Sequence, residues 1–268
     1  MANDQDYQRG FTLRQGLGIF ALLLVANLII AGLSSMFFGL HVTVLVSEAV
    51  ILLVPASFLY AGGYSFRDLL SYRHKPGPLF YLWLIVATIS LYVVVSDITG
   101  YVNQLVPRPK VQQEALLKLF VAKTWPEYLF RLFGAAALAG FCEEFAFRGF
   151  LQSIFSKRLG GIKAFILTAF LFAFMHLDPW NFAGVFLLGL FLGYIVYLTG
   201  NLWLAIFIHF FSNSVAFSIG FFSPDVGADF GYASPPYVTL IFTFFFIVSL
   251  GFVRKVYERG QWPVVARE

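Results

Sequence analysis

The sequence predicts an all-α polytopic membrane protein with about eight transmembrane helices, built as a single integral membrane domain over residues 1–268. Of the 268 residues, 59% are hydrophobic and only 12% are charged, whereas soluble domains carry about 25% charged residues. Apolar runs of about 20 residues, the length that crosses a bilayer, recur along the chain. This composition excludes a nucleic-acid binder, a disulfide scaffold and a disordered chain, and it makes the lipid bilayer the expected environment.

The N-terminal segment 1–96 is predicted to hold three spans. These spans are expected over residues 17–40, 42–62 and 79–96. The second contains Glu48, whose role the sequence leaves open between a structural hydrogen-bonding group and an additional polar wall. Its turn to the first span, near His41, is short.

A polar segment, residues 97–126, follows the third span and is predicted to form an extracytoplasmic loop. Within it, Leu116, Leu117, Phe120 and Val121 recur on one face of a helix. We expect an amphipathic helix that lies on the membrane surface or over a cavity mouth. A simple linker helix explains the same pattern equally well.

Residues 127–253 are predicted to form a five-span core. The spans are expected over residues 127–156, 162–176, 180–198, 202–222 and 237–253. Gly189, Gly193 and Gly200 are predicted to permit close helix contacts. Cys142, the single cysteine, is expected to be a small packing residue. The chain shows no convincing internal repeat, so an inverted-repeat transporter has no support.

The distribution of basic residues predicts that both termini are cytoplasmic. With eight spans the termini share one side of the membrane, and 13 of the 18 Lys and Arg residues fall on that side. The 13 are Arg9, Arg14, Arg67, Arg73, Lys75, Arg148, Lys157, Arg158, Lys163, Arg254, Lys255, Arg259 and Arg267. The short, compact chain suits a bacterial plasma membrane.

Three polar motifs lie inside the predicted C-terminal spans, where an ionisable group costs about 2.5–3.5 kcal/mol. They are EEFAFR at 143–148, FAFMH at 172–176 and HFFSN at 209–213. The helical rise of about 1.5 Å per residue places their polar groups at similar depths. Groups from three helices are therefore expected in one layer, an arrangement that favours hydrolysis over packing alone.

Spacing within each motif predicts which groups interact. Glu144 and Arg148 are separated by four residues, so they share a helix face and can pair. Glu143 is rotated away by about 100° and is left free to face a pocket as a general base. His209 and Asn213 present two hydrogen-bond donors on one face. The Phe172 ring, four residues before His176, is expected to position that imidazole.

Two other kinds of chemistry remain open on these residues. Glu143, His176 and His209 could ligate zinc with water as the fourth ligand, although the HExxH signature of zincins is absent. A proton-coupled transporter could use Glu48, Glu143 and Glu144 as a relay.

The three motifs resemble the EExxxR, FxxxH and HxxxN motifs of the CPBP (Abi-like) intramembrane proteases. This group includes the CAAX prenyl proteases of the second type and bacteriocin-processing enzymes. The resemblance covers about Gly140–Val215. It implies helices around a catalytic cavity within the membrane, and an intramembrane endopeptidase acting on membrane-embedded or lipid-tethered peptides and proteins.

The resemblance also implies roles for single residues. Glu143 and His176 would activate a water molecule, and His209 and Asn213 would form the oxyanion hole. The predicted ion pair of the EEFAFR motif would keep the site in shape. The family favours a mechanism without a cofactor, with a zinc-dependent protease as the alternative. A non-catalytic bacteriocin-immunity or binding protein that keeps the fold is a further alternative, and the oligomeric state is left open.

Overall fold

The computed structural model describes residues 10–64, 70, 76–225 and 232–260. All regular elements in this part of the chain are helical, which confirms the all-α class. Within the described residues, six helices are long and apolar enough to cross a membrane, as an integral membrane protein requires. They are α2 (Leu13–Phe37), α3 (Leu40–Ala61), α5 (Pro78–Leu105), α11 (Phe182–Thr199), α12 (Leu202–Phe222) and α14 (Pro236–Arg259).

The other two predicted spans have a different character. One is α10 (Gly161–Met175), which is apolar but shorter. The other is a rod of five successive helical elements, here called the composite rod. Its parts are α7 (Trp125–Phe130), η1 (Arg131–Ala136), α8 (Ala137–Glu144), η2 (Phe145–Leu151) and α9 (Gln152–Leu159). The count of eight spans therefore stays a prediction.

The elements η1 and η2 are π-helical, a conformation that is rare and concentrated at functional positions. Segment η1 begins at Arg131, whose side chain donates hydrogen bonds to the carbonyl oxygens of Leu119 (2.7 Å) and Lys118 (2.9 Å). Segment η2 begins directly after Glu144 and contains Arg148. The segment η1 thus begins at a buried charged residue, and η2 begins directly after one.

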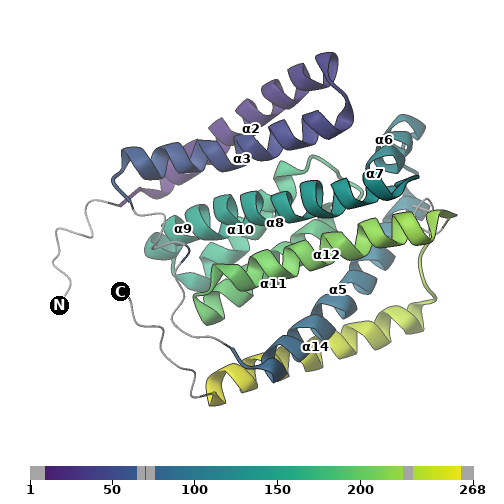
Figure 1. The fold of residues 1–268 in the computed structure, drawn as a ribbon. Coiled ribbons are helices and arrows are strands. Elements are labelled where there is room, and N and C mark those ends of the chain that lie inside the picture. Colours follow the sequence, from purple (N-terminus) through teal and green to yellow (C-terminus); the bar gives the residue numbers. More distant parts are fainter. Residues whose placement is uncertain (1–9, 65–69, 71–75, 226–231, 261–268) are drawn as a thin grey trace.

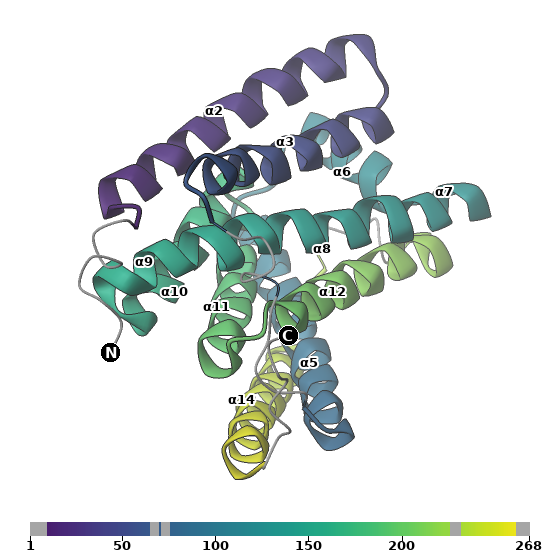
Figure 2. The ribbon, with the colours of Figure 1, turned by 60° about the vertical axis from the view of Figure 1, so that its left-hand side comes forward.

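The helices form layers (Figures 1 and 2). The α2/α3 hairpin lies on one side and packs through α3 against α8 and η2. The composite rod, α10, α11 and α12 form the centre, and α5 pairs with α14 on the far side. Although α5 follows the hairpin in sequence, it packs against α14, α11 and α12. The first three predicted spans are therefore divided between opposite layers.

Helix α5 continues to Leu105, beyond its predicted end at residue 96. Asp97 is consequently buried inside a helix instead of lying in a loop. Its carboxylate accepts hydrogen bonds from the Ser234 backbone N–H (2.8 Å) and from the Thr239 hydroxyl (2.7 Å), at the start of α14. These partners satisfy the charge, so the apolar helix can contain it.

The predicted amphipathic segment contains a helix, α6 (Lys110–Phe120), with no buried residue. Its C-terminal end packs against α12, where the Phe120 and Phe217 ring centroids lie 5.4 Å apart. A side chain at Gly220 would collide with the Phe120 carbonyl group. The helix is thus held against α12, and a position on the membrane surface or over a cavity mouth stays a prediction.

Two of the three singled-out glycines permit close helix contacts, as predicted. A Cβ atom on Gly189 would lie 3.1 Å from the Cα of Ala169, and one on Gly193 would lie 2.9 Å from the Cβ of Phe165. For Gly200 the prediction of a close helix contact is wrong, because a Cβ there would meet nothing within 4 Å. It ends α11 with a left-handed backbone (φ +61°), which favours glycine for conformational reasons.

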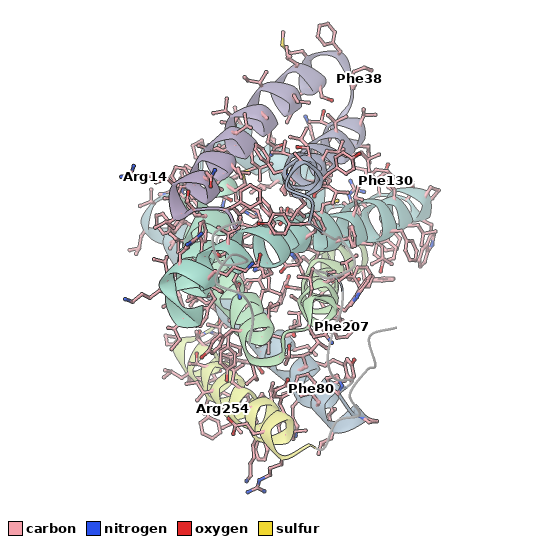
Figure 3. All side chains as sticks on the ribbon, turned by 90° about the vertical axis from the view of Figure 1, so that its left-hand side faces the viewer. Arg14, Phe38, Phe80, Phe130, Phe207 and Arg254 are labelled. Atoms are coloured by element: carbon pink, nitrogen blue, oxygen red, sulfur yellow. The ribbon has the colours of Figure 1, made fainter. Side chains whose placement is uncertain are left out.

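The outer surfaces of α2 and α14 expose many large apolar side chains (Figure 3). Such a surface suits contact with lipid. The beginning of α2 and the end of α14 lie at the same end of the bundle (Figure 1). Five of the 13 basic residues on which the predicted orientation rests lie outside the described residues: Arg9, Arg67, Arg73, Lys75 and Arg267. Cytoplasmic termini and a bacterial membrane therefore stay predictions.

We expect Gly193→Val to lower the free energy of unfolding by about 1–3 kcal/mol, because the added side chain overpacks the contact between α11 and α10. Gly251→Val is the matched control, since a Cβ at Gly251 in α14 meets nothing within 4 Å. Thermal unfolding in detergent measures both variants. Equal loss of stability in the two would contradict a packing role for Gly193.

Candidate active site

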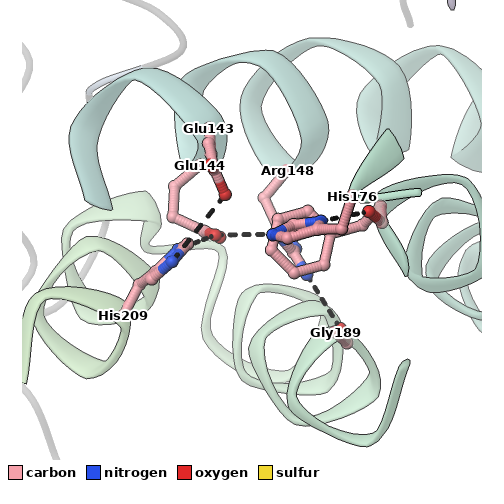
Figure 4. A network of polar contacts seen from close by, with 7 residues as sticks. Glu143, Glu144, Arg148, His176, Gly189 and His209 are labelled. Carbon is pink, nitrogen blue, oxygen red and sulfur yellow. Dashed lines mark hydrogen bonds and ion pairs between the residues drawn. The ribbon is translucent and has the colours of Figure 1, made fainter. Parts of the chain in front are cut away.

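The fold brings the EEFAFR and HFFSN motifs together at one buried carboxylate (Figure 4). Glu144, the last residue of α8, accepts hydrogen bonds at a single oxygen, Oε1. Arg148 Nη1 donates to it at 2.7 Å and His209 Nδ1 lies 2.8 Å from it. The side chains of Glu144 and Arg148 are fully buried. The predicted pair within one helix therefore exists, and it extends to an imidazole of α12.

Arg148 also connects the composite rod to two further helices. Its Nη2 donates to the carbonyl oxygen of Gly189 in α11 at 3.1 Å. Its guanidinium carbon lies 4.2 Å from the ring centroid of Phe172 in α10, within the range of a cation–π interaction. One buried guanidinium thus contacts α11, α10 and its own helix.

Phe172 contacts both imidazoles of the site. Its ring centroid lies 4.8 Å from that of His176 and 5.8 Å from that of His209, with steep interplanar angles of 72° and 90°. His176 Nδ1 lies 2.8 Å from the Phe172 carbonyl oxygen, so it must carry the proton that this bond requires. In the neutral ring, Nε2 is then left with a free lone pair. The sequence indicated the contact with His176 and missed the one with His209.

The two adjacent glutamates occupy opposite environments. The Glu144 side chain is 0% exposed, whereas the Glu143 side chain is 13% exposed. Glu143 Oε2 has no hydrogen-bond partner among the described residues and lies 3.8 Å from His209 Nε2. Gly140 supports this approach of α8 to α12, because a Cβ there would lie 3.1 Å from the backbone N of Phe210.

The remaining predicted groups are less tightly connected. Asn213 is half-buried one turn after His209 on α12, and its side chain makes no hydrogen bond within the described ranges. No hydrogen bond joins His176 to Glu143 in that part of the chain either. The structure therefore brings Glu143, Glu144, Arg148 and His209 into one network, with His176 attached through Phe172.

Glu48 lies in α3, which packs against α8. It is buried, and its Oε2 has no hydrogen-bond partner among the described residues. It interacts electrostatically with Glu143. In the sequence, Glu48 stood out as the one charged residue of an apolar span. In the structure, its helix packs beside α8, which carries Glu143.

Gln152 is a supporting residue that the sequence did not indicate. Its Nε2 donates to the carbonyl oxygen of Gly193 at 3.0 Å, one helical turn beyond the bond from Arg148 to Gly189. The side chains of Arg148 and Gln152 therefore make two successive hydrogen bonds to α11. The sequence could have indicated this contact, because Arg148 and Gln152 are four residues apart and so are Gly189 and Gly193.

The zinc alternative can be compared with this geometry. Glu143, His176 and His209 offer the right donor atoms, and both Nδ1 atoms are already held by other groups, as is common for zinc-binding histidines. Within the described residues, however, no three His, Cys, Asp or Glu side chains lie close enough together to hold one metal ion. The zinc alternative therefore stays untested.

We expect Arg148→Met to lower the free energy of unfolding by about 3–5 kcal/mol, because the buried Glu144 carboxylate loses its compensating charge. Arg254→Met is the control, since it removes an exposed i,i+4 pair with Glu258 and should cost about 1 kcal/mol or less. Chemical unfolding in detergent measures both. The double variant Glu144→Gln/Arg148→Met should recover part of the loss, and equal effects of the two single changes would contradict the assignment.

Comparison with known proteins finds one family match. Residues 125–215 match the family described as type II CAAX prenyl endopeptidase Rce1-like. No curated protein matches the chain. The matched segment runs from the start of α7 into α12 and includes all three motifs. The resemblance that the motifs indicate is thus confirmed by a match to the Rce1-like family of type II CAAX prenyl endopeptidases over residues 125–215.

Proposed function

We propose that this protein is an intramembrane endopeptidase that uses Glu143 to activate water. The family supports a protease of the CAAX type, and the apolar helices support its place in a membrane. The observation that carries the proposal is the contrast between two adjacent glutamates. Glu144 is fully buried with its Oε1 bonded to Arg148 and His209, whereas the Glu143 side chain is 13% exposed and its Oε2 lies 3.8 Å from His209 Nε2.

In this mechanism Glu143 accepts a proton from water while the water oxygen attacks the carbonyl carbon of the scissile peptide. The C–N bond then breaks, and the proton passes from Glu143 to the leaving amine nitrogen. His176 offers the free lone pair of Nε2, because its Nδ1 is engaged by the Phe172 carbonyl oxygen. It orients the same water by accepting its second hydrogen.

His209 and Asn213 would donate hydrogen bonds to the oxyanion that forms on the attacked carbonyl. His209 Nδ1 is engaged by Glu144, so donation from Nε2 requires the imidazolium form. Asn213 would donate its side-chain N–H group, which makes no hydrogen bond to any described residue. One donor of this kind typically contributes about 10²–10³ in kcat. Glu144 and Arg148 fix the ring and do not touch the substrate.

The substrates would be membrane-embedded or lipid-tethered peptides and proteins. The site residues lie on helices whose outer surfaces are apolar, and such surfaces favour approach from within the bilayer over approach from water. The family description names prenylated CAAX termini. The proposal covers lipid-tethered substrates in general and does not specify a prenyl group.

Glu143→Gln should reduce kcat by about 10²–10⁴ and leave stability unchanged, because the amide cannot accept the proton of water. Glu114→Gln, an exposed change in α6, is the control. Mass spectrometry of peptide termini in membranes from cells that express each variant equally measures the effect. Termini that persist with Glu143→Gln would show that Glu143 is not the base.

Because we propose a mechanism without a metal, treatment of the purified protein with a strong chelator should leave its cleavage rate unchanged. The measurement is the cleavage rate before and after chelation, and again after zinc is added. Loss of cleavage on chelation and its return with zinc would instead support Glu143, His176 and His209 as zinc ligands.

A further inference from the structure

The loop that follows His176 contains an unusual backbone conformation. Helix α10 ends at Met175 and His176 caps it. The next residue, Leu177, has φ +50° and is the only non-glycine with positive φ in the described ranges. For such a residue the left-handed region costs about 1–2 kcal/mol. Its side chain is 51% exposed, so burial of that side chain gives little compensation for the strain.

The segment between α5 and α6 holds this loop in place. Arg108 Nη1 donates to Asp178 Oδ2 at 3.0 Å, and both side chains are largely buried. The second Asp178 oxygen accepts from the Trp180 backbone N–H at 3.2 Å. The indole N–H of Trp180 donates to the Val106 carbonyl oxygen at 2.7 Å, and the Arg108 guanidinium carbon lies 5.1 Å from the indole centroid. We call Arg108, Asp178 and Trp180 the clasp.

Both sides of the clasp are anchored to helices. Asn181 Oδ1 accepts from the Thr99 hydroxyl in α5 at 2.9 Å, and the Asn181 carbonyl oxygen accepts the first hydrogen bond of α11. On the other side, Gln113 of α6 donates to the Arg108 carbonyl oxygen at 2.9 Å. The loop after His176 is therefore fixed at its middle and at its end, and the N–H of its strained first residue, Leu177, donates to the Phe174 carbonyl oxygen of α10 at 3.2 Å.

We propose that the clasp positions the His176 imidazole for catalysis. By holding Asp178 and Trp180 against the α5–α6 segment, it keeps Leu177 in the left-handed conformation and α10 ended at Met175. The His176 ring then remains on Phe172, with Nδ1 bonded to the carbonyl oxygen of that residue. Strained residues that are retained by their surroundings concentrate at functional sites. Arg108 and Asp178 are thus positioning residues.

This inference rests on the catalytic role proposed for His176, but it concerns a different part of the chain. Arg108 lies outside the segment that matches the family, and none of the three motifs contains a clasp residue. The clasp couples the family segment to the end of α5, whose far side is bonded to the start of α14 through Asp97.

The test removes the ion pair with two separate variants, Arg108→Gln and Asp178→Asn. The second keeps the shape of the side chain and an oxygen for the Trp180 N–H. Cleavage of a lipid-tethered fluorogenic peptide in proteoliposomes gives kcat and KM. We expect kcat to fall by up to about 10²-fold, the effect of a displacement near 1 Å, with KM unchanged. Arg108→Lys, which keeps the charge, should restore part of kcat, and Arg254→Gln is the control for loss of an exposed ion pair.

A second readout does not depend on proteolysis. Diethyl pyrocarbonate modifies accessible imidazoles, and mass spectrometry resolves the rate at each histidine. His176 is exposed, as is His41, but its Nδ1 is engaged by the Phe172 carbonyl oxygen. Loss of that bond should make His176 react several-fold faster in Arg108→Gln and in Asp178→Asn, with the rate at His41 unchanged. Wild-type modification rates and wild-type kcat in both variants would overturn the proposal. Faster modification in a protein whose wild-type form cleaves nothing would support the clasp and contradict the proposed function.

Discussion

The site depends on one oxygen atom, Glu144 Oε1, which accepts from Arg148 and contacts His209 Nδ1. A buried carboxylate is costly unless its charge is compensated, and here Arg148 and His209 both engage Oε1, while Oε2 has no hydrogen-bond partner among the described residues. The consequences extend outward. Arg148 is fixed over Phe172 and on the Gly189 carbonyl oxygen, and the ring of His209 is fixed with Nε2 toward Glu143.

Close helix packing makes this network possible. Gly189 and Gly193 let α11 approach α10, so that two α11 carbonyl oxygens come within reach of Arg148 and Gln152. Gly140 does the same for α8 and α12. The π-helical segment η2 begins where the network begins. Small residues at helix contacts are the usual means of association in a membrane, where apolar burial gives no net drive.

The network separates two tasks that polar groups must perform in an apolar protein. Glu144 and Arg148 are fully buried and hold the geometry, whereas Glu143 and His176, the residues proposed to act on water, keep Oε2 and Nε2 outside the hydrogen bonds of the network. Glu48 adds a further buried carboxylate that interacts electrostatically with Glu143. The loop after His176 is held by residues outside the family segment, so the site draws on the whole chain.

The sequence by itself determined the fold class, the three motifs and the Glu144–Arg148 pair. Each of these depends on composition or on contacts within one helical turn, and spacing along the chain specifies such contacts. The tertiary structure alone decided that His209 bonds to Glu144, 65 residues away, and that α5 runs on past Asp97. The partners of Asp97 lie 137 and 142 residues further along the chain. The same holds for the clasp, because Arg108 meets Asp178 only after α5, α10 and α11 have packed. Contacts between distant segments follow from packing, which local periodicity does not encode.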